Sequence, residues 1–442
     1  MKRLILILTV LAGSMVSVKA QQSYSLKEAQ EYAVLHAYSA RKAEVEIARS
    51  KSRVRELIGT GLPQISAEGT YNNNVQVPTS VIPGEFFGAP AGTFIPVKFG
   101  VRHQATGAIT ANQLLFSGTY IVGLQAARAY EGLSVGLKER NAVQIRQDVA
   151  NAYFSVIASQ ENVATLRKGI ASNEQLSKEA TAQYENGLAD EQASDQARLN
   201  LITNRNRLES AEKQVEFTLN LLKFQMGLPQ TAEISVSENV NSLVEIDGAE
   251  LLQTEGNINE NVDYKLALRL TSLNELGVKA AKSQYLPTLA AFATHQQNAF
   301  ANKFNEFGRQ SFFPASIIGL RLTVPIFSAG VKHQQVRQAQ LALDTAMINQ
   351  ELIKEVVIMG QRNARIDYIA KLKTFDTQKE ALALAQKLKD KTQIMVREGL
   401  SGSTEMATSE NQFLLTQGAY IQAVIDVLNA KVAFQKAFNK LN

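Results

Sequence analysis

Cysteine is absent from the 442 residues, and this absence removes several kinds of chemistry at once. Without thiols the chain has no disulfides, no thiolate metal site, no cysteine nucleophile and no cysteine for lipid attachment at a mature N-terminus. The four histidines, His36, His103, His295 and His333, are scattered, and no pair has metal-ligand spacing. Glycine-rich phosphate loops and the GxSxG nucleophile elbow are also missing. We therefore expect no enzyme, no cofactor and no metal site.

Long apolar runs are missing after residue 20. No later segment approaches the ~18 apolar residues that a membrane-spanning helix needs. Residues 1–20 have the pattern of a signal peptide: Lys2 and Arg3 precede an apolar run, and Val18-Lys19-Ala20 is a small-residue cleavage context. A buried first helix is the alternative interpretation. We expect an exported chain that is either soluble or crosses a membrane as a β-barrel.

A large charge excess is also lacking. The whole chain has 46 basic and 41 acidic residues, and removal of the signal peptide would take away three basic residues and no acids, leaving 43 against 41, or +2. No basic cluster with interleaved aromatic residues occurs, so we expect no nucleic-acid partner.

Proline is scarce, and its nine positions divide the chain. Two segments, 118–184 and 330–398, contain no proline over 67 and 69 residues. As helices they would be roughly 100 Å long, because each residue adds 1.5 Å. All nine prolines fall in expected strands, loops or junctions, which avoids the cost of about 3 kcal/mol for a proline inside a helix.

The two proline-free segments belong to an internal repeat. Leu62-Pro63-Gln64-Ile65 recurs as Leu286-Pro287-Thr288-Leu289, Leu114-Leu115-Phe116-Ser117 as Pro325-Ile326-Phe327-Ser328, and Gly187-Leu188 as Gly399-Leu400. The three landmarks keep their order, which indicates a tandem duplication.

Each copy is expected to contain a helix, a strand hairpin, a long helix and a return helix. In repeat 1, over 21–228, the hairpin covers 62–116, the long helix 118–186 and the return helix 190–227. Residues 229–260 hold seven acids and no Lys or Arg, and we interpret them as an acidic linker. In repeat 2, over 261–442, the hairpin covers 287–327, the long helix 330–398 and the return helix 402–441. The first helix of repeat 1 should run from the Ser25–Glu28 capping box to about residue 57.

The strands are recognised by period two. Polar residues alternate with less polar ones over 64–77, and Asn73 breaks the less polar face, so the crossing part should end near it. Residues 78–100 contain four prolines, which indicates a long exposed loop.

The fold class is therefore mainly α with a small β part of four strands per chain. Four strands cannot close a barrel, so copies must associate, as a dimer with 8 strands, a trimer with 12 or a tetramer with 16.

This order of landmarks resembles the TolC family of outer-membrane efflux channels, and the resemblance covers residues 21–442. It implies a homotrimer whose α-helical barrel continues a 12-stranded transmembrane β-barrel in the outer-membrane lipid of a Gram-negative cell, with a long periplasmic portion. It also implies a periplasmic adaptor (membrane fusion) protein and an inner-membrane pump of the RND or ABC type as partners. The function would be a passive exit duct for drugs or secreted cargo, opened at its periplasmic tip.

The resemblance also assigns roles at the tips. Gly187-Leu188 and Gly399-Leu400 are the expected adaptor-docking turns, although turn chemistry alone would explain the glycines. Family members often have an aspartate six residues after each tip glycine, where this chain has Ala193 and Glu405. We expect Glu405, with the acids of the first tip, at the periplasmic constriction; a helix-capping role is the alternative. The acids of the first tip are Asp190, Glu191 and Asp195.

Two departures concern gating. A tyrosine and an arginine that flank the second tip glycine in some members are replaced by Val396 and Ser401, so a latch of that kind is not expected in the same form.

The second function class is a soluble periplasmic coiled-coil scaffold or adaptor, which would have no need for repeated membrane-length hairpins. The sequence leaves open the cargo, the pump class and, on physical grounds alone, the number of copies.

Overall fold

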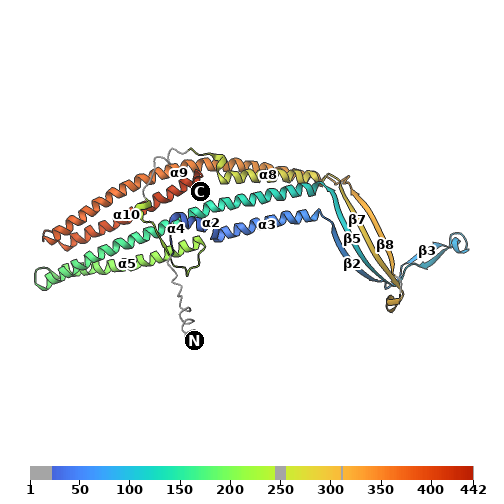
Figure 1. Cartoon of the computed structure of the whole chain (residues 1–442), viewed down its shortest axis with the longest axis horizontal. Helices are drawn as coiled ribbons and strands as arrows, with labels where there is room; N and C mark the ends of the chain where they lie inside the picture. The colour runs from blue at the N-terminus through green and yellow to red at the C-terminus, as the bar shows by residue number, and fades with distance from the viewer. Residues whose placement is uncertain (1–21, 244–254, 310–311, 442) are drawn as a thin grey trace, which may run out of the picture. The chain divides into compact units, whose positions relative to one another are not determined.

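The computed structural model describes residues 22–243, 255–309 and 312–441 (Figure 1). The predicted signal peptide and part of the predicted acidic linker lie outside these residues. The described chain is mainly helical with a small β part, as predicted from the sequence. The longer helices are α2 (Leu26–His36), α3 (Tyr38–Thr60), α4 (Gly118–Glu185), α5 (Glu191–Met226), α8 (Val262–Ser283), α9 (Val331–Arg397) and α10 (Ser403–Ala437).

The first expected helix is interrupted, which differs from the prediction of one helix to about residue 57. The Ser25–Glu28 capping box is present at the start of α2, but Ala37 leaves the helix with φ −56° and ψ 147°. Gly227, which ends α5 with φ +76°, packs against this break so closely that a Cβ would lie 2.4 Å from the His36 carbonyl oxygen. The break therefore accommodates the close approach of the α5 terminus.

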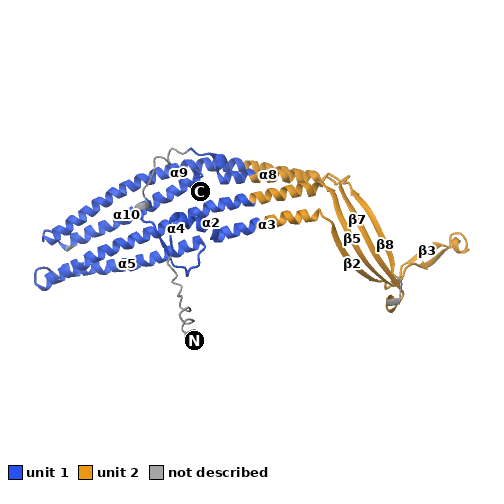
Figure 2. Cartoon of the chain, in the orientation of Figure 1, with its two compact units in different colours: residues 1–47, 134–268, 349–442 blue, residues 48–133, 269–348 orange. Residues whose placement is uncertain are grey.

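Two compact units divide the chain (Figure 2), and neither follows the boundaries of the sequence repeat. The first consists of residues 1–47, 134–268 and 349–442, and the second of residues 48–133 and 269–348.

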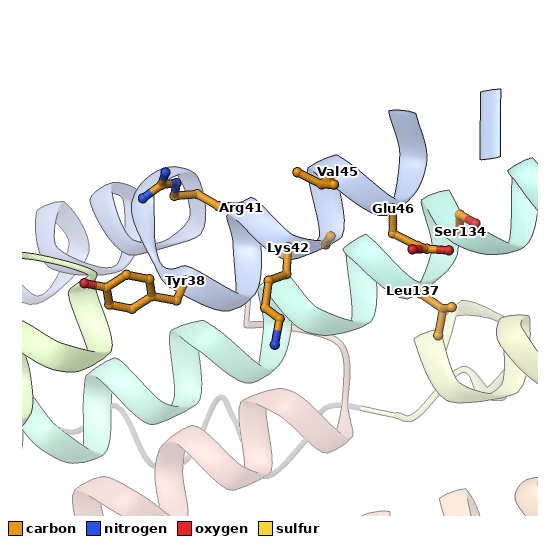
Figure 3. A pocket seen from close by; sticks show the side chains of 8 residues that line it. Tyr38, Arg41, Lys42, Val45, Glu46, Ser134 and Leu137 are labelled. Atoms are coloured by element: carbon orange, nitrogen blue, oxygen red, sulfur yellow. The ribbon is translucent and has the colours of Figure 1, made fainter. Parts of the chain in front are cut away.

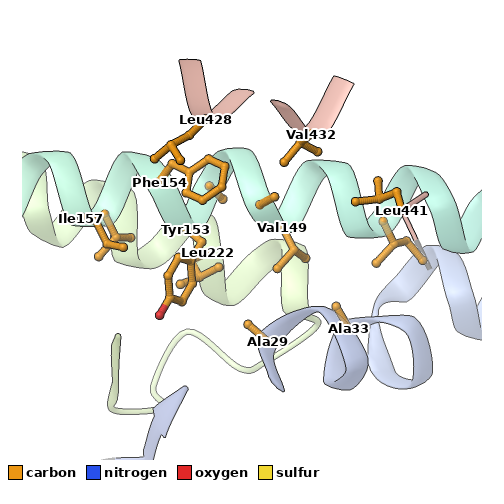
Figure 4. Close-up of a cluster of buried hydrophobic side chains, with 14 of the residues drawn as sticks. Ala29, Ala33, Val149, Tyr153, Phe154, Ile157, Leu222, Leu428, Val432 and Leu441 are labelled. Atoms are coloured by element: carbon orange, nitrogen blue, oxygen red, sulfur yellow. The ribbon is translucent and has the colours of Figure 1, made fainter. Parts of the chain in front are cut away.

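The core of the first unit is a continuous cluster on α2, α4, α5, α9 and α10 (Figure 4). Tyr153, Leu222 and Phe434 are fully buried there, beside the small Ala29 and Ala33 of α2. Strand β1 (Gln22–Tyr24) pairs in parallel with β6 (Ile234–Val236), so the start of the chain is joined to the segment after α5. Short helix α6 (Val240–Leu243) and 3-10 helix η2 (Ile258–Glu260) complete this unit.

The second unit carries a four-stranded antiparallel sheet in the order β2-β5-β7-β8. Its strands are β2 (Gln64–Asn73), β5 (His103–Ser117), β7 (Thr288–Ala301) and β8 (Phe313–Thr323). Strand β2 ends at Asn73, the residue at which the sequence predicts the loss of the apolar face. The segment predicted as an exposed loop also contains a hairpin, β3 (Thr79–Pro83) with β4 (Phe94–Lys98), joined by 3-10 helix η1 (Gly84–Phe87).

Opposite faces of the four-stranded sheet have different chemistry. One face carries most of the threonine and asparagine, with Thr106 donating to Asn298 at 2.9 Å and Thr110 bonded to Thr294 at 3.2 Å, although the register also places Phe292 there. On the other face Ile65 and Ile318 are 75% and 87% exposed, too much for a sheet face covered by its own chain. His295 and Ser316 are polar exceptions there, and they bond to one another at 2.8 Å.

Aromatic rings gather at the loop end of the apolar face. The 3-10 helix η3 (Phe304–Arg309) supplies Phe304 and Phe307, which pack against Tyr71 and His103 with centroids 5.9 to 6.3 Å apart. The Tyr71 hydroxyl is 2.8 Å from His103 Nδ1. Among the described residues, no helix combines the length and the apolar character needed to cross a membrane.

Candidate functional site

The two helical hairpins of the first unit end in turns of the same construction. Gly187 and Gly399 have φ of +72° and +70°, the left-handed conformation that favours glycine. The Gly187 amide donates to the Tyr184 carbonyl at 2.9 Å and the Leu188 amide to the Gln183 carbonyl at 2.8 Å. Gly399 and Leu400 repeat this pattern at 3.1 and 2.8 Å. These paired bonds are the Schellman motif, which satisfies the last carbonyls of a helix.

A leucine protrudes from each turn. Leu188 is 80% and Leu400 74% exposed, although each follows a glycine that completes the backbone turn by itself. An apolar residue after the glycine is common in this motif, but a contact within the turn would cover it, and these two leucines remain largely exposed.

The predicted acids start the two return helices. Asp190 is the N-cap of α5, and its Oδ1 accepts from the Ala193 amide at 2.8 Å. Glu405, in the first turn of α10, accepts from the Gly402 amide through Oε2 at 3.1 Å. Both carboxylates therefore satisfy amides that the helix leaves free, which is the capping role considered as the alternative.

One chain brings only some of the predicted tip residues together. Leu188 and Gly399 line a cavity of about 840 Å³ between the ends of the two hairpins. Glu191 and Asp195 lie with Arg198 along a shallow groove of about 560 Å³ on α5. Neither of these two hollows has Glu405 in its lining.

A buried ion pair adjoins the larger cavity through Glu410, and sequence reasoning missed it. Lys389 Nζ of α9 is 3.2 Å from Glu410 Oε2 of α10, with side chains only 11% and 8% exposed. The ammonium also lies 4.4 Å from the centroid of the Phe413 ring. The signal was present, because Lys389 lies ten residues before Gly399 and Glu410 eleven residues after it. Residues at nearly equal distances from an antiparallel turn face each other.

Other ion pairs join the helices of each hairpin. Arg167 of α4 is 2.7 Å from Glu212 of α5, and Glu174 is 2.6 Å from Arg205. In the second hairpin Lys371 is 2.8 Å from Asp426. The hydrogen bond to Asp426 raises the pKa of Lys371. Burial opposes ionisation of Asp426, but the bonds from Lys371 and Gln422, together with the Lys371 charge, lower the pKa of Asp426. These contacts fix the register of the helices that carry the tips.

A third hollow, of about 830 Å³, lies on the side of α3 and α4 (Figure 3). Arg41, Lys42 and Glu46 line it together with the apolar Val45 and Leu137. Charged side chains are interspersed with apolar ones here, and Ser134 of α4 also lines this hollow. The described residues also contain no group of three or more His, Asp or Glu able to hold a metal ion.

No protein-family model and no curated protein matches the sequence. Solved structures do match, over more than 90% of the chain. The outer membrane channel CmeC of Campylobacter jejuni aligns with a TM-score of 0.69 and 16% identity, covering 94% of this chain and 85% of that one.

Two further structures agree. The Neisseria gonorrhoeae outer membrane channel MtrE, in its open state, has a TM-score of 0.70 and 15% identity, with 94% and 89% coverage. The Vibrio cholerae outer membrane protein VceC has a TM-score of 0.67 and 15% identity, and the alignment covers 93% of this chain and 95% of that one. The predicted resemblance is thus confirmed at the level of the fold: this chain has the fold of the TolC-family outer-membrane channels.

Proposed function

We propose that this protein is the outer-membrane channel of a tripartite efflux or export system, a passive exit duct whose periplasmic end lies at the helical tips. The observation that carries the proposal is the fold match over nearly the whole chain, helices and sheet together. A partial match to the helices alone would have served a periplasmic scaffold equally well.

The sheet supports a membrane location. Its exposed apolar face carries Ile65, Ile109, Ile318, Leu320 and Leu322, which suit contact with lipid chains. The polar face, with its Thr106–Asn298 and Thr110–Thr294 pairs, suits a water-filled interior. Each of the strands β2 and β8 has one edge without a strand partner among the described residues, and such an edge is costly in lipid.

These edges support closure by several copies. Three copies would give the 12-stranded transmembrane β-barrel that the sequence resemblance implies. Rings of eight or sixteen strands remain as the dimer and tetramer alternatives. In this arrangement each copy contributes one four-stranded segment, and β8 of one copy pairs with β2 of the next.

At the helical tips, the exposed Leu188 and Leu400 are proposed as contacts for a periplasmic adaptor protein, which would connect the duct to an inner-membrane pump of the RND or ABC type. Glu405, with Asp190, Glu191 and Asp195 nearby in the hairpins, is proposed to contribute to an acidic ring at the periplasmic mouth. A single copy cannot form a ring, so this role also depends on assembly.

Gel migration and channel recording test the duct. The full-length protein is extracted from outer membranes in detergent and run with and without heating, and then added to a planar lipid bilayer. We expect an oligomer that becomes a monomer only on heating, and discrete conductance steps. A protein that fractionates with the soluble periplasm and gives no conductance would favour the scaffold or adaptor instead.

Substitution of the tip leucines tests docking. Leu400→Asp should weaken adaptor binding about tenfold or more, because burying one leucine is worth about 1.5–3 kcal/mol. Leu188→Asp tests the first tip in the same way, and Leu400→Met is the matched control. The measurement is binding of purified adaptor to the immobilised oligomer. Normal binding and export by Leu400→Asp would remove the leucine from the docking surface.

A further inference from the structure

Glu68 and Arg321 are the two charged residues, apart from histidines, in the strands of the four-stranded sheet. Both lie on edge strands, Glu68 on β2 and Arg321 on β8. We propose that Glu68 of one copy forms an ion pair with Arg321 of the adjacent copy, so that one such pair specifies the register at every seam. This inference rests on the proposed function.

The strand register puts both side chains on the polar face. Glu68 pairs with Ala108, Ala108 with Gln296, and Gln296 with Ala315 of β8. Arg321 is six residues beyond Ala315 on the same strand, since 321 − 315 = 6. Because side chains alternate between faces with period two, an even separation leaves Arg321 on the face of Glu68.

The six-residue separation falls within the stagger expected for a closed ring of tilted strands. From β2 of one copy to β2 of the next there are four steps between neighbouring strands, each about 4.8 Å wide. With a tilt of about 35–45°, four steps displace the register by about 13–19 Å along the strand. At about 3.3 Å per residue this equals about four to six residues. A stagger that carries β2 of the next copy toward the helical end of β8 therefore places Glu68 opposite Arg321.

Within one chain the two residues cannot meet. They lie at opposite edges with β5 and β7 between them, separated by about 14 Å across the sheet and by about 20 Å along the strands. The structure records no ion pair for either of them among the described residues. Arg321 instead places its guanidinium 5.3 Å from the centroid of the Phe292 ring. A guanidinium stacked on a ring keeps its N–H groups in the plane and free to donate to a carboxylate.

A register device is physically useful at this seam. A slip of one residue would turn the apolar side chains of a strand toward the polar interior, and a slip of two would preserve the faces. Alternation therefore cannot prevent even slips, whereas a single charge pair can, because any other even register leaves both charges without a partner.

Cysteine cross-linking gives a direct test, and because the natural sequence has no cysteine, only the introduced thiols can form a disulfide. Glu68→Cys and Arg321→Cys are introduced together into the full chain, and membranes are oxidised and analysed on denaturing gels without reductant. We expect linked dimers and trimers that reductant converts to monomers, and none from either single variant. Glu68→Cys with Thr323→Cys, displaced by two residues, is the matched control and should cross-link at least fivefold less.

Charge exchange provides a second readout. Glu68→Arg and Arg321→Glu should each lower the temperature at which the oligomer dissociates on gels, and the two together should restore it. If the wild type is oligomeric and conducting, but the double cysteine variant gives no cross-link and the charge exchange gives no restoration, the seam pair is overturned and the duct is left intact. A wild type that neither oligomerises nor conducts would instead overturn the proposed function.

Discussion

At the scale of single residues, Tyr153 shows how a polar atom is used inside an apolar core. Its side chain is fully buried on α4, and its hydroxyl donates to the Tyr24 carbonyl at 2.8 Å, joining the long helix to β1. Burial raises the pKa of Tyr153 to about 12, and the nearby Glu238 carboxylate contributes in the same direction. The folded protein therefore holds this proton over a pH range in which an unfolded tyrosine, with a pKa near 10, releases it.

The sign of the pH dependence follows. Because the pKa of Tyr153 is raised on folding, its contribution to stability is complete below pH 10 and is lost as the pH rises from 10 to 12. A difference of about two units corresponds to at most about 3 kcal/mol. Tyr153→Phe should cost about 1 kcal/mol at pH 8 and show a smaller fall in melting temperature between pH 10 and 12. Circular dichroism of the detergent-solubilised protein measures both.

The exposed Tyr184, on the same helix, supplies the control for that measurement. Tyr184→Phe should retain the alkaline loss of stability seen in the wild type. Equal alkaline losses in Tyr153→Phe and wild type would show that this hydroxyl is not the group responsible.

At the scale of elements, the long helices could be predicted because their signals are local. Absence of proline, a glycine at each C-terminus and an acid at each following N-terminus place α4 and α9 to within a residue or so of their observed ends. The capping box formed by Ser25 and Glu28 was likewise predicted from the sequence, and it is present at the start of α2. Each of these signals acts through backbone groups within one turn of the helix, so no tertiary information is needed.

Other element features depend on contacts that sequence spacing does not reveal. The break at Ala37 contains no proline or glycine, and it is explained by the distant Gly227 packed against it. For Lys389 and Glu410 the spacing about Gly399 indicates that they face each other, but it does not reveal their burial, which comes from the packing of α9 on α10. The β3–β4 hairpin was hidden by its prolines, which are tolerated at the edges of a two-stranded ribbon.

At the scale of the whole molecule, the number of strands in one chain indicates that several copies associate. In the part of the chain that the structure describes, four strands form a sheet with two unpaired edges, which predicts association of copies, and the strand count from sequence already supports that step. The candidate site was predictable only in part. Gly187 and Gly399 are at turns as expected, whereas one chain uses Asp190 and Glu405 as helix caps. A mouth assembled from several copies would give the same carboxylates a second, collective role.

Channel selectivity separates these two roles of Glu405, because the two depend on different properties of the side chain. Glutamine retains the oxygen that accepts from the Gly402 amide but removes the charge. If Glu405 forms an acidic ring, Glu405→Gln should move the reversal potential in a salt gradient toward zero, with roughly a twofold or greater loss of cation preference. Asp190→Asn, which likewise keeps an N-cap, tests the first hairpin in the same recording.

Helix capping alone predicts a different outcome from that experiment. Since both amides cap well, neither substitution should alter the melting temperature of the oligomer by more than a degree or two. Glu191→Gln and Asp195→Asn, which lie along the groove on α5, show whether the charge of the first tip acts at a distance. If wild type and Glu405→Gln have the same reversal potential, the carboxylate serves only the start of α10. A shift confined to Glu405→Gln would show that the second hairpin, and not the first, supplies the charge that selects cations.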